Sequence, residues 1–154
     1  MRKDYQIVED NTFEMDEIEA VEKQWTNIWD NGGWVPRRVK YFKYKEEYRV
    51  MRPYLKKLLP GAKGLDGGCG LGEWIQFLSQ FKFDILGVDI SKILIVKLSK
   101  LMKGYKFLQG DIRNLEVAND SVDFYYSWGT FEHFEEGLDT CIIEAYRVLK
   151  PNGC

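Results

Sequence analysis

The chain has 154 residues and a formal net charge of −2, with 45% hydrophobic and 30% charged residues. That length suits one domain, which can bury roughly two-thirds of the surface of its unfolded chain. The negative charge argues against a general nucleic-acid-binding protein, since such proteins need a clear positive excess. Three cysteines without framework spacing, a polar N-terminus and no apolar run near the roughly 18 residues of a membrane span predict a soluble cytoplasmic protein without a membrane partner.

The first 31 residues predict a loose arm followed by a helix. Residues 1–12 are polar and mixed in charge, as in a weakly held terminus. Apolar residues then recur at helical spacing over residues 15–29, and Asn31-Gly32-Gly33 ends the helix. The apolar face of this helix comprises Ile18, Val21, Trp25, Ile28 and Trp29.

An aromatic and basic segment, residues 34–54, comes next. Between Arg37 and Lys57 there are nine lysines or arginines and only two acids. One interpretation is a lid that helps to hold an anionic or aromatic ligand, and the other is a solvated basic face whose aromatic residues pack on the main domain. Pro53 predicts the first residue of a short helix over residues 53–59. We therefore expect an N-terminal arm and lid segment over residues 1–52 and a core domain over residues 53–154.

From Lys63 onward, short apolar runs alternate with helical patterns. Strands are expected up to Asp66 and at residues 83–89, 105–109 and 122–127, and helices at 73–80, 91–102 and 138–149. Ser91 is a suitable N-cap for the second of these helices. Alternating strands and helices predict an α/β fold with an open, mostly parallel sheet of about four strands and helices on both faces. The apolar face of the last helix comprises Leu138, Ile142, Ala145, Tyr146 and Leu149.

The segment GLDGGCGLG, residues 64–72, is the centre of the predicted site. Its glycines Gly68, Gly70 and Gly72 stand at alternate positions between a strand and the start of a helix. Glycine permits a tight turn and lets a ligand approach the backbone, and a helix start offers N–H groups to an anionic group. This arrangement is typical of a nucleotide-type site, although three spaced glycines also occur in flexible turns.

Two acids follow the next two predicted strands. Asp89 lies 21 residues after Gly68, a spacing that suits a carboxylate binding the two hydroxyls of a ribose. Asp111 follows the third strand and could accept a hydrogen bond from an adenine amino group. Either acid could instead be a capping or turn residue. Because the carboxyl ends of parallel strands meet at one edge, we expect the glycines and both acids to lie together there.

Five segments, in this order and spacing, resemble the motifs of class I S-adenosylmethionine-dependent methyltransferases. GLDGGCGLG resembles their first motif, GVDIS the acid of their second strand, and GDIRNL their third motif. SVDFYYSWGTFEHF resembles the fourth motif, and EAYRVLKPNG the helix before their fifth strand. The resemblance covers about residues 53–154 and implies a Rossmann-like fold with S-adenosylmethionine as cofactor and S-adenosylhomocysteine as product. A dinucleotide dehydrogenase is disfavoured, because its glycines follow the pattern GxGxxG.

The resemblance also implies roles for individual residues. The glycine turn would lie against the methionine part of the cofactor, with Asp66 ordering the turn. Asp89 would bind the ribose hydroxyls, and Asp111 the adenine amine. The full implied cofactor site is Asp66, Gly68, Cys69, Gly70, Gly72, Asp89, Ile90, Asp111, Ile112, Ser127 and Trp128.

Four of these residues have more specific implied roles. Ile90 and Ile112 would pack beside the adenine, and Ser127 and Trp128 would line the sulfonium end. Cys69 occupies a position that is often cysteine in this family, and we interpret it as a small packing residue rather than a nucleophile. No metal site is expected.

His133 is the only histidine and sits just past the fourth strand, close to the expected methyl acceptor. One hypothesis makes it a catalytic base or an acceptor-positioning group. The other makes it a histidine at a helix start with a structural role.

The chain stops at Cys154, directly after RVLKPNG. Members of the family continue with a fifth strand and an antiparallel pair, so we expect a methyltransferase core that is truncated before its fifth strand. The fourth strand would then have an open edge, which predicts a homodimer that covers it. We expect methyl transfer to a small-molecule acceptor. The alternatives are a non-catalytic cofactor-binding module and a nicotinamide-dependent oxidoreductase.

Overall fold

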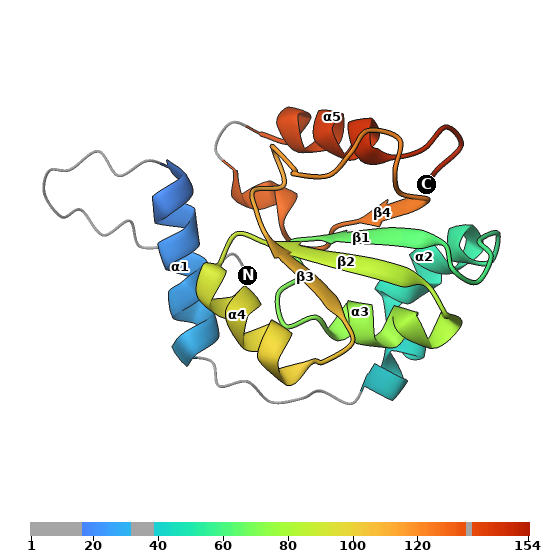
Figure 1. The fold of residues 1–154 in the computed structure, drawn as a ribbon, viewed down its shortest axis with the longest axis horizontal. Helices are drawn as coiled ribbons and strands as arrows, with labels where there is room; N and C mark the ends of the chain where they lie inside the picture. Colours follow the sequence, from blue (N-terminus) through green and yellow to red (C-terminus); the bar gives the residue numbers. More distant parts are fainter. Residues whose placement is uncertain (1–16, 32–38, 135–136) are drawn as a thin grey trace, which may run out of the picture.

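The computed structural model describes residues 17–31, 39–134 and 137–154, and its centre is one parallel sheet (Figure 1). The strands are β1 (Lys63–Gly67), β2 (Asp84–Asp89), β3 (Lys106–Gln109) and β4 (Phe124–Tyr126). They lie in the order β3-β2-β1-β4, and every pair is parallel. The predicted α/β fold with a four-stranded parallel sheet is therefore confirmed.

Helices cover both faces of this sheet (Figure 1). The α-helices are α1 (Glu17–Asn31), α2 (Glu46–Leu55), α3 (Glu73–Leu78), α4 (Lys92–Leu101) and α5 (Asp139–Val148). Short 3-10 helices are η1 (Val39–Tyr44), η2 (Ser79–Phe81) and η3 (Phe131–His133). Among the described residues, no helix has both the length and the apolar character that crossing a membrane requires.

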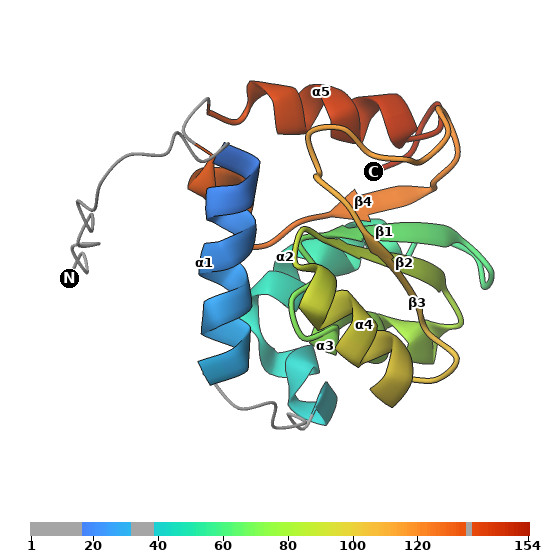
Figure 2. The same ribbon diagram turned by 60° about the vertical axis from the view of Figure 1, so that its left-hand side comes forward.

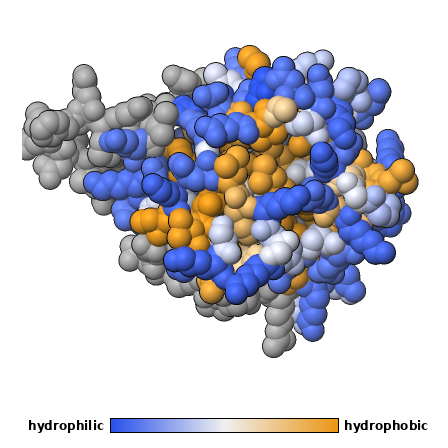
Figure 3. All heavy atoms as spheres, viewed as in Figure 1, coloured by the Kyte–Doolittle hydropathy of each residue, from blue (hydrophilic) through white to orange (hydrophobic). Residues whose placement is uncertain are grey.

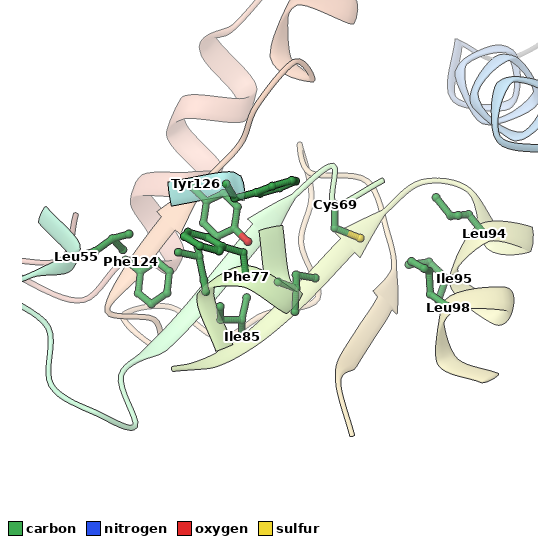
Figure 4. Packing of buried hydrophobic residues seen from close by; sticks show 12 residues of the cluster. Leu55, Cys69, Phe77, Ile85, Leu94, Ile95, Leu98, Phe124 and Tyr126 are labelled. Atoms are coloured by element: carbon green, nitrogen blue, oxygen red, sulfur yellow. The ribbon is translucent and has the colours of Figure 1, made fainter. Parts of the chain in front are cut away.

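Two hydrophobic cores follow from the alternation of side chains along the strands. Ile85 and Phe124 point to the face covered by α2, α3 and α4, and the core there is shown in Figure 4. Leu65 and Val88 point to the opposite face, which is covered by α5. Ser91 caps α4 as predicted, because its Oγ accepts a hydrogen bond from the Leu94 N–H at 3.3 Å. Figure 3 also shows exposed hydrophobic side chains over α4, and Ile93, Val96 and Leu101 of that helix are among the exposed apolar residues.

The predicted helix that begins at Pro53 is wrong. Pro53 lies inside α2, which begins at Glu46 and ends at Leu55. A proline in the last turn removes only one hydrogen bond, and the packing of α2 compensates for it. The ring of Tyr48 in α2 packs edge-on against Phe77 of α3, with ring centroids 5.0 Å apart.

The described part of the aromatic and basic segment, residues 39–54, fits the interpretation as a packed basic face. Phe42 is buried, and its ring contacts Trp74 with centroids 4.7 Å apart. Tyr41, Tyr44 and Tyr54 are exposed beside lysines. None of the described residues from 39 to 54 lines the cavity described below.

The predicted apolar face of α5 is wrong at three of its five residues, while Ala145 is half-buried and Leu149 packs against the second core. Leu138, Ile142 and Tyr146 are exposed, with Tyr146 at 81%, and the buried residues of α5 are instead Cys141, Glu144 and Val148. The cause is a polar anchor that the helix makes with residues 115–119.

That anchor consists of Glu144 and Arg147. The Leu115 N–H donates to Glu144 Oε1 at 2.6 Å, and Arg147 donates to the carbonyl oxygens of Leu115 and Val117 at 3.0 and 2.8 Å. The hydrogen bonds from Arg147 lower the pKa of the Glu144 carboxyl below its ordinary value. These contacts orient α5 so that its polar anchor faces inward and Leu138, Ile142 and Tyr146 face solvent.

The predicted open edge of β4 is partly covered. Residues 148–154 run along it, and the Tyr125 N–H donates to the Cys154 carbonyl oxygen at 2.8 Å. The Lys150 N–H donates to the Val122 carbonyl oxygen at 2.9 Å. Val122 pairs with Leu149 in an isolated parallel bridge that lies outside β4. The strand β4 therefore spans only Phe124–Tyr126 and is shorter than the predicted strand. A dimer through this edge stays a prediction, with fewer open backbone groups than expected.

Candidate functional site at the carboxyl edge of the sheet

A cavity of about 300 Å³ lies where the four strands end. Its walls come from residues within the segments 66–74, 89–90, 110–112 and 128–134, which follow the four strands in turn, and from Val21 and Trp25 of α1. The carboxyl ends of parallel strands share one edge, and open α/β sheets bind ligands there. The size is within the usual range of small-molecule sites.

The cavity brings together most of the predicted site residues. Those that line it are Asp66, Gly68, Cys69, Gly70, Asp89, Ile90, Asp111, Ile112, Trp128 and His133. Two others do not line it. Gly72 has a φ of 69° and lies near Phe107 and Met102 in the core. Ser127 donates from its Oγ to the carbonyl oxygen of Gly67 at 2.6 Å and so fixes the end of β1.

The glycine loop is pinned to the end of β2 by backbone hydrogen bonds. The N–H groups of Gly68 and Cys69 both donate to the Val88 carbonyl oxygen, at 2.8 and 2.9 Å. Gly68 has a φ of 78°, and a Cβ at this position would collide with the side chain of Thr130. Only glycine therefore fits here, for both conformational and steric reasons.

Cys69 has the environment of a packing residue. Its side chain is buried within the first core, and burial raises the pKa of the thiol well above its ordinary value. A thiol that stays protonated is a poor nucleophile. This supports the interpretation of Cys69 as a small residue that lets the loop pack closely.

The carboxylate of Asp89 joins the glycine loop to the start of α4. Its Oδ2 accepts a hydrogen bond from the Gly70 N–H at 3.0 Å, and its Oδ1 one from the Ser91 N–H at 3.0 Å. Burial raises the pKa of this carboxyl, and the two backbone hydrogen bonds oppose the shift. Each carboxylate oxygen can accept a second hydrogen bond, so a ligand with two adjacent hydroxyls could still be bound.

Asp66 is the most deeply buried acid of the site, with 4% of its surface exposed. Burial raises its pKa to about 7, the hydrogen bond from Tyr126 opposes this, and the nearby charge of Asp89 adds to it. The Tyr126 hydroxyl donates to Asp66 Oδ2 at 2.9 Å. Asp66 thus connects the end of β1 to β4 beneath the glycine loop.

Asp66→Asn is expected to stabilise the protein at alkaline pH. The folded-state pKa of Asp66 lies above its ordinary value of 3.8, so folding stability falls as pH rises from about 4 through 7. Asparagine cannot ionise and still offers an oxygen to Tyr126. Urea unfolding should show a gain on the order of 1 kcal/mol or more at about pH 8, which shrinks as the pH falls toward 4. A gain of equal size at both ends of this range would contradict the assignment, and the exposed Asp84→Asn is the control.

Asp111 has a partner that the sequence interpretation missed. Arg113 donates from Nη2 to Asp111 Oδ2 at 2.9 Å and from Nε to both oxygens at 3.1 and 3.2 Å. The guanidinium also lies over the ring of Phe134, 4.4 Å from its centroid. The charge of Asp111 is therefore compensated from behind the cavity wall. A cation two residues after the acid was the available signal.

The sequence interpretation also missed the part played by α1. The rings of Trp25 and His133 meet edge to face, with centroids 4.8 Å apart. The Thr26 Oγ1 lies 2.7 Å from the Ser91 Oγ, and the Lys92 N–H donates to Glu22 Oε1 at 3.2 Å. Figure 2 shows α1 standing beside η3 and α4. The apolar spacing of Val21 and Trp25 was visible in the sequence, but it did not indicate which surface they would cover.

Comparisons with known proteins agree with this geometry. Residues 65–153 match a family model described as a methyltransferase domain, and this match covers more than half of the chain. A malonyl-[acyl-carrier protein] O-methyltransferase of Pectobacterium atrosepticum is 28% identical over 116 residues, which cover 73% of this chain and 46% of that protein. A demethylmenaquinone methyltransferase of Bacillus velezensis is 30% identical over 120 residues, which cover 73% of this chain and 51% of that protein.

A solved structure is also similar to this chain. The PH0226 protein of Pyrococcus horikoshii OT3 has a TM-score of 0.60 and 29% identity, with 77% of this chain and 58% of that chain covered. The chain thus spans about half the length of the two curated relatives. The match to the family model shows that this chain belongs to the class I S-adenosylmethionine-dependent methyltransferases.

Proposed function

We propose that this chain binds S-adenosylmethionine in the cavity at the carboxyl edge and transfers its methyl group to a small-molecule acceptor. The observation that carries the proposal is the carboxylate of Asp89, which is buried and held by the N–H groups of Gly70 and Ser91. That geometry suits a ribose with two hydroxyls.

The remaining walls fit the rest of the cofactor. Asp66 and the loop at Gly68 would hold the methionine part, and Ile90 and Ile112 would pack on the adenine. Asp111 would accept from the adenine amine with a carboxylate already oriented by Arg113. We keep Gly72 and Ser127 as supports of the site, because neither lines the cavity.

The chemistry that the cofactor supplies is an electrophilic methyl group on a sulfonium. The protein residues have to orient the acceptor and exclude water. Trp25 of α1, Trp128 and His133 form the aromatic part of the wall that would do so. In this proposal, α1 is the part of the N-terminal segment that acts as a lid over the cavity.

The two curated relatives differ in the acceptors that their names state, malonyl-[acyl-carrier protein] and demethylmenaquinone. Those names therefore support a methyl transfer here without selecting one acceptor.

Calorimetric titration with S-adenosylhomocysteine tests the cofactor, with NAD as a parallel control. Binding in the micromolar range for S-adenosylhomocysteine alone is expected, since its roughly 8 kcal/mol is typical of a site with several hydrogen bonds and a buried ring. Binding of NAD instead would favour the nicotinamide-dependent alternative. Binding of neither would reject the proposed site.

His133→Ala is expected to slow methyl transfer about tenfold, which corresponds to a rise of about 1.4 kcal/mol in the activation free energy. The reason is that His133 lines the cavity on the side where the acceptor is expected, and its ring packs edge to face against Trp25. Transfer of a tritiated methyl group, measured on an acceptor found by screening, gives the rate. The affinity for S-adenosylhomocysteine should not change. An unchanged rate would assign His133 a structural role, and His133→Gln tests whether a polar group suffices.

A further inference from the structure

Asp111, which lines the cavity shortly after β3, is held by a single residue. Within the described part of the chain, the hydrogen bonds to its carboxylate all come from Arg113. The backbone N–H of Arg113 donates to Oδ1 at 2.9 Å, Nη2 donates to Oδ2 at 2.9 Å, and Nε lies 3.2 Å from Oδ1 and 3.1 Å from Oδ2. Arg113 itself does not line the cavity, so it acts on a ligand there through Asp111.

These contacts leave little of the carboxylate free. Three N–H groups of Arg113 share the carboxylate of Asp111, which offers about four acceptor sites. About one acceptor site therefore remains for a ligand in the cavity. One such site suits a group that donates a single N–H, such as the amino group at position 6 of a purine. A carbonyl oxygen in the same place would face another acceptor with no hydrogen between them.

The guanidinium of Arg113 is itself held in place on its other side. Its face lies over the ring of Phe134, 4.4 Å from the centroid, and this ring is 8% exposed. The side chains of Arg113 and Asp111 are only 10% and 16% exposed. A guanidinium is planar, so its edge can bind a carboxylate while its face packs on a ring, and a lysine ammonium can do neither. The packing on Phe134 therefore fixes the direction in which the N–H groups of Arg113 point.

We infer that Arg113 is a positioning residue that makes the cofactor site specific for a 6-amino purine over a 6-oxo purine, an inference that rests on the proposed function. Arg113 holds the carboxylate of Asp111 in one orientation, in which about one acceptor site stays open to the ligand. A carboxylate released from Arg113 can turn away from a carbonyl oxygen, which removes the repulsion. It also no longer meets an amino group with a fixed geometry.

The test compares two ligands, S-adenosylhomocysteine and S-inosylhomocysteine, which carries a carbonyl oxygen in place of the 6-amino group. Calorimetry gives the ratio of their affinities. The unmodified protein is expected to prefer S-adenosylhomocysteine on the order of 100-fold, the effect of one lost hydrogen bond to a charged group and one repulsive contact. Arg113→Lys keeps the positive charge and loses the planar fork, so it should reduce this ratio about tenfold. A general weakening of the site would lower both affinities alike and leave the ratio unchanged.

Arg147→Lys is the matched control. Arg147 also forms an ion pair with an acid, because its Nη2 lies 2.7 Å from Glu144 Oε1, but neither residue lines the cavity. This substitution should leave the ratio of the two affinities unchanged. An equal fall of the ratio in the two variants would overturn the role assigned to Arg113.

A double-mutant cycle with Asp111→Asn shows whether Arg113 acts through Asp111. An amide offers either its oxygen or its NH2 group, so Asp111→Asn should bring the ratio close to one, and adding Arg113→Lys should not change it further. Equal binding of the two ligands by the unmodified protein, or an unchanged ratio in Arg113→Lys, would overturn the inference and leave the proposed function. Failure of the unmodified protein to bind S-adenosylhomocysteine would instead remove both.

Discussion

Asp89→Ala is expected to lower the affinity for S-adenosylhomocysteine about 100-fold. The variant loses the hydrogen bonds of two ribose hydroxyls to a charged acceptor, each of which contributes roughly 1.5–3 kcal/mol. A factor of ten in affinity corresponds to about 1.4 kcal/mol, so two such bonds give 100-fold or more. The variant also frees the Gly70 and Ser91 N–H groups, which now share the carboxylate. Calorimetry at one salt concentration measures the change.

The matched control is Asp84→Ala. Asp84 is the same residue type at the other end of the same strand, where it is exposed and forms an ion pair with Lys106 at 2.7 Å. An exposed pair of this kind contributes at most about 1 kcal/mol to stability and nothing to the site. An Asp89→Ala protein that melts normally and binds as well as the Asp84→Ala protein would contradict the ribose role.

Phe124→Ala is expected to reduce the free energy of unfolding by about 3–5 kcal/mol, the usual cost of removing a buried phenylalanine side chain. Phe124 is 2% exposed and fills the space over Gly64, where a Cβ would collide with its ring. Its ring also contacts Phe83 and Tyr126, with centroids 5.2 and 6.2 Å apart. The void that the substitution leaves in the core lies between the sheet and the helices, where backbone shifts cannot close it. Urea unfolding followed by circular dichroism gives the difference.

Phe81→Ala tests whether position in the core, rather than residue type, sets this cost. Phe81 belongs to the same run of aromatic contacts but is 42% exposed at its outer end. Its substitution should cost about 1–2 kcal/mol, because much of the ring already contacts water. Equal losses for the two variants would show that the core is not packed as described.

The strands and the glycine loop could be predicted because their signals are local. A buried strand, an alternating run of glycines and an acid at the next strand end each lie within a few residues of one another. Parallel geometry then brings Gly68, Asp89 and Asp111 together, since all three follow carboxyl ends of the sheet. The part of the cavity formed by the ends of the strands could be predicted from these segments and their order, whereas the wall that α1 supplies could not.

The orientation of α5 could not be predicted in this way. Its apolar spacing favoured burial of Ile142 and Tyr146, but the hydrogen bond that the Leu115 N–H, 29 residues earlier, donates to Glu144 helps to decide which face turns inward. Periodicity cannot detect a polar contact between distant segments. The helix start predicted at Pro53 was wrong for a related reason. Packing of α2 on α3 outweighed the local preference of proline for the first position of a helix.

The attachment of α1 could not be predicted from the sequence either, since Thr26 and Ser91, which are in contact, are 65 residues apart. This attachment has a dynamic consequence. None of the described side chains of α1 is fully buried, and two hydrogen bonds and the Trp25 ring hold it to residues beside the cavity. Detaching such a helix exposes far less surface than unfolding the sheet, so it can open as a separate unit at lower free energy. Amide hydrogens of α1 should therefore exchange with solvent well before those of β1 and β2, and each such opening uncovers one wall of the site while the glycine loop stays folded.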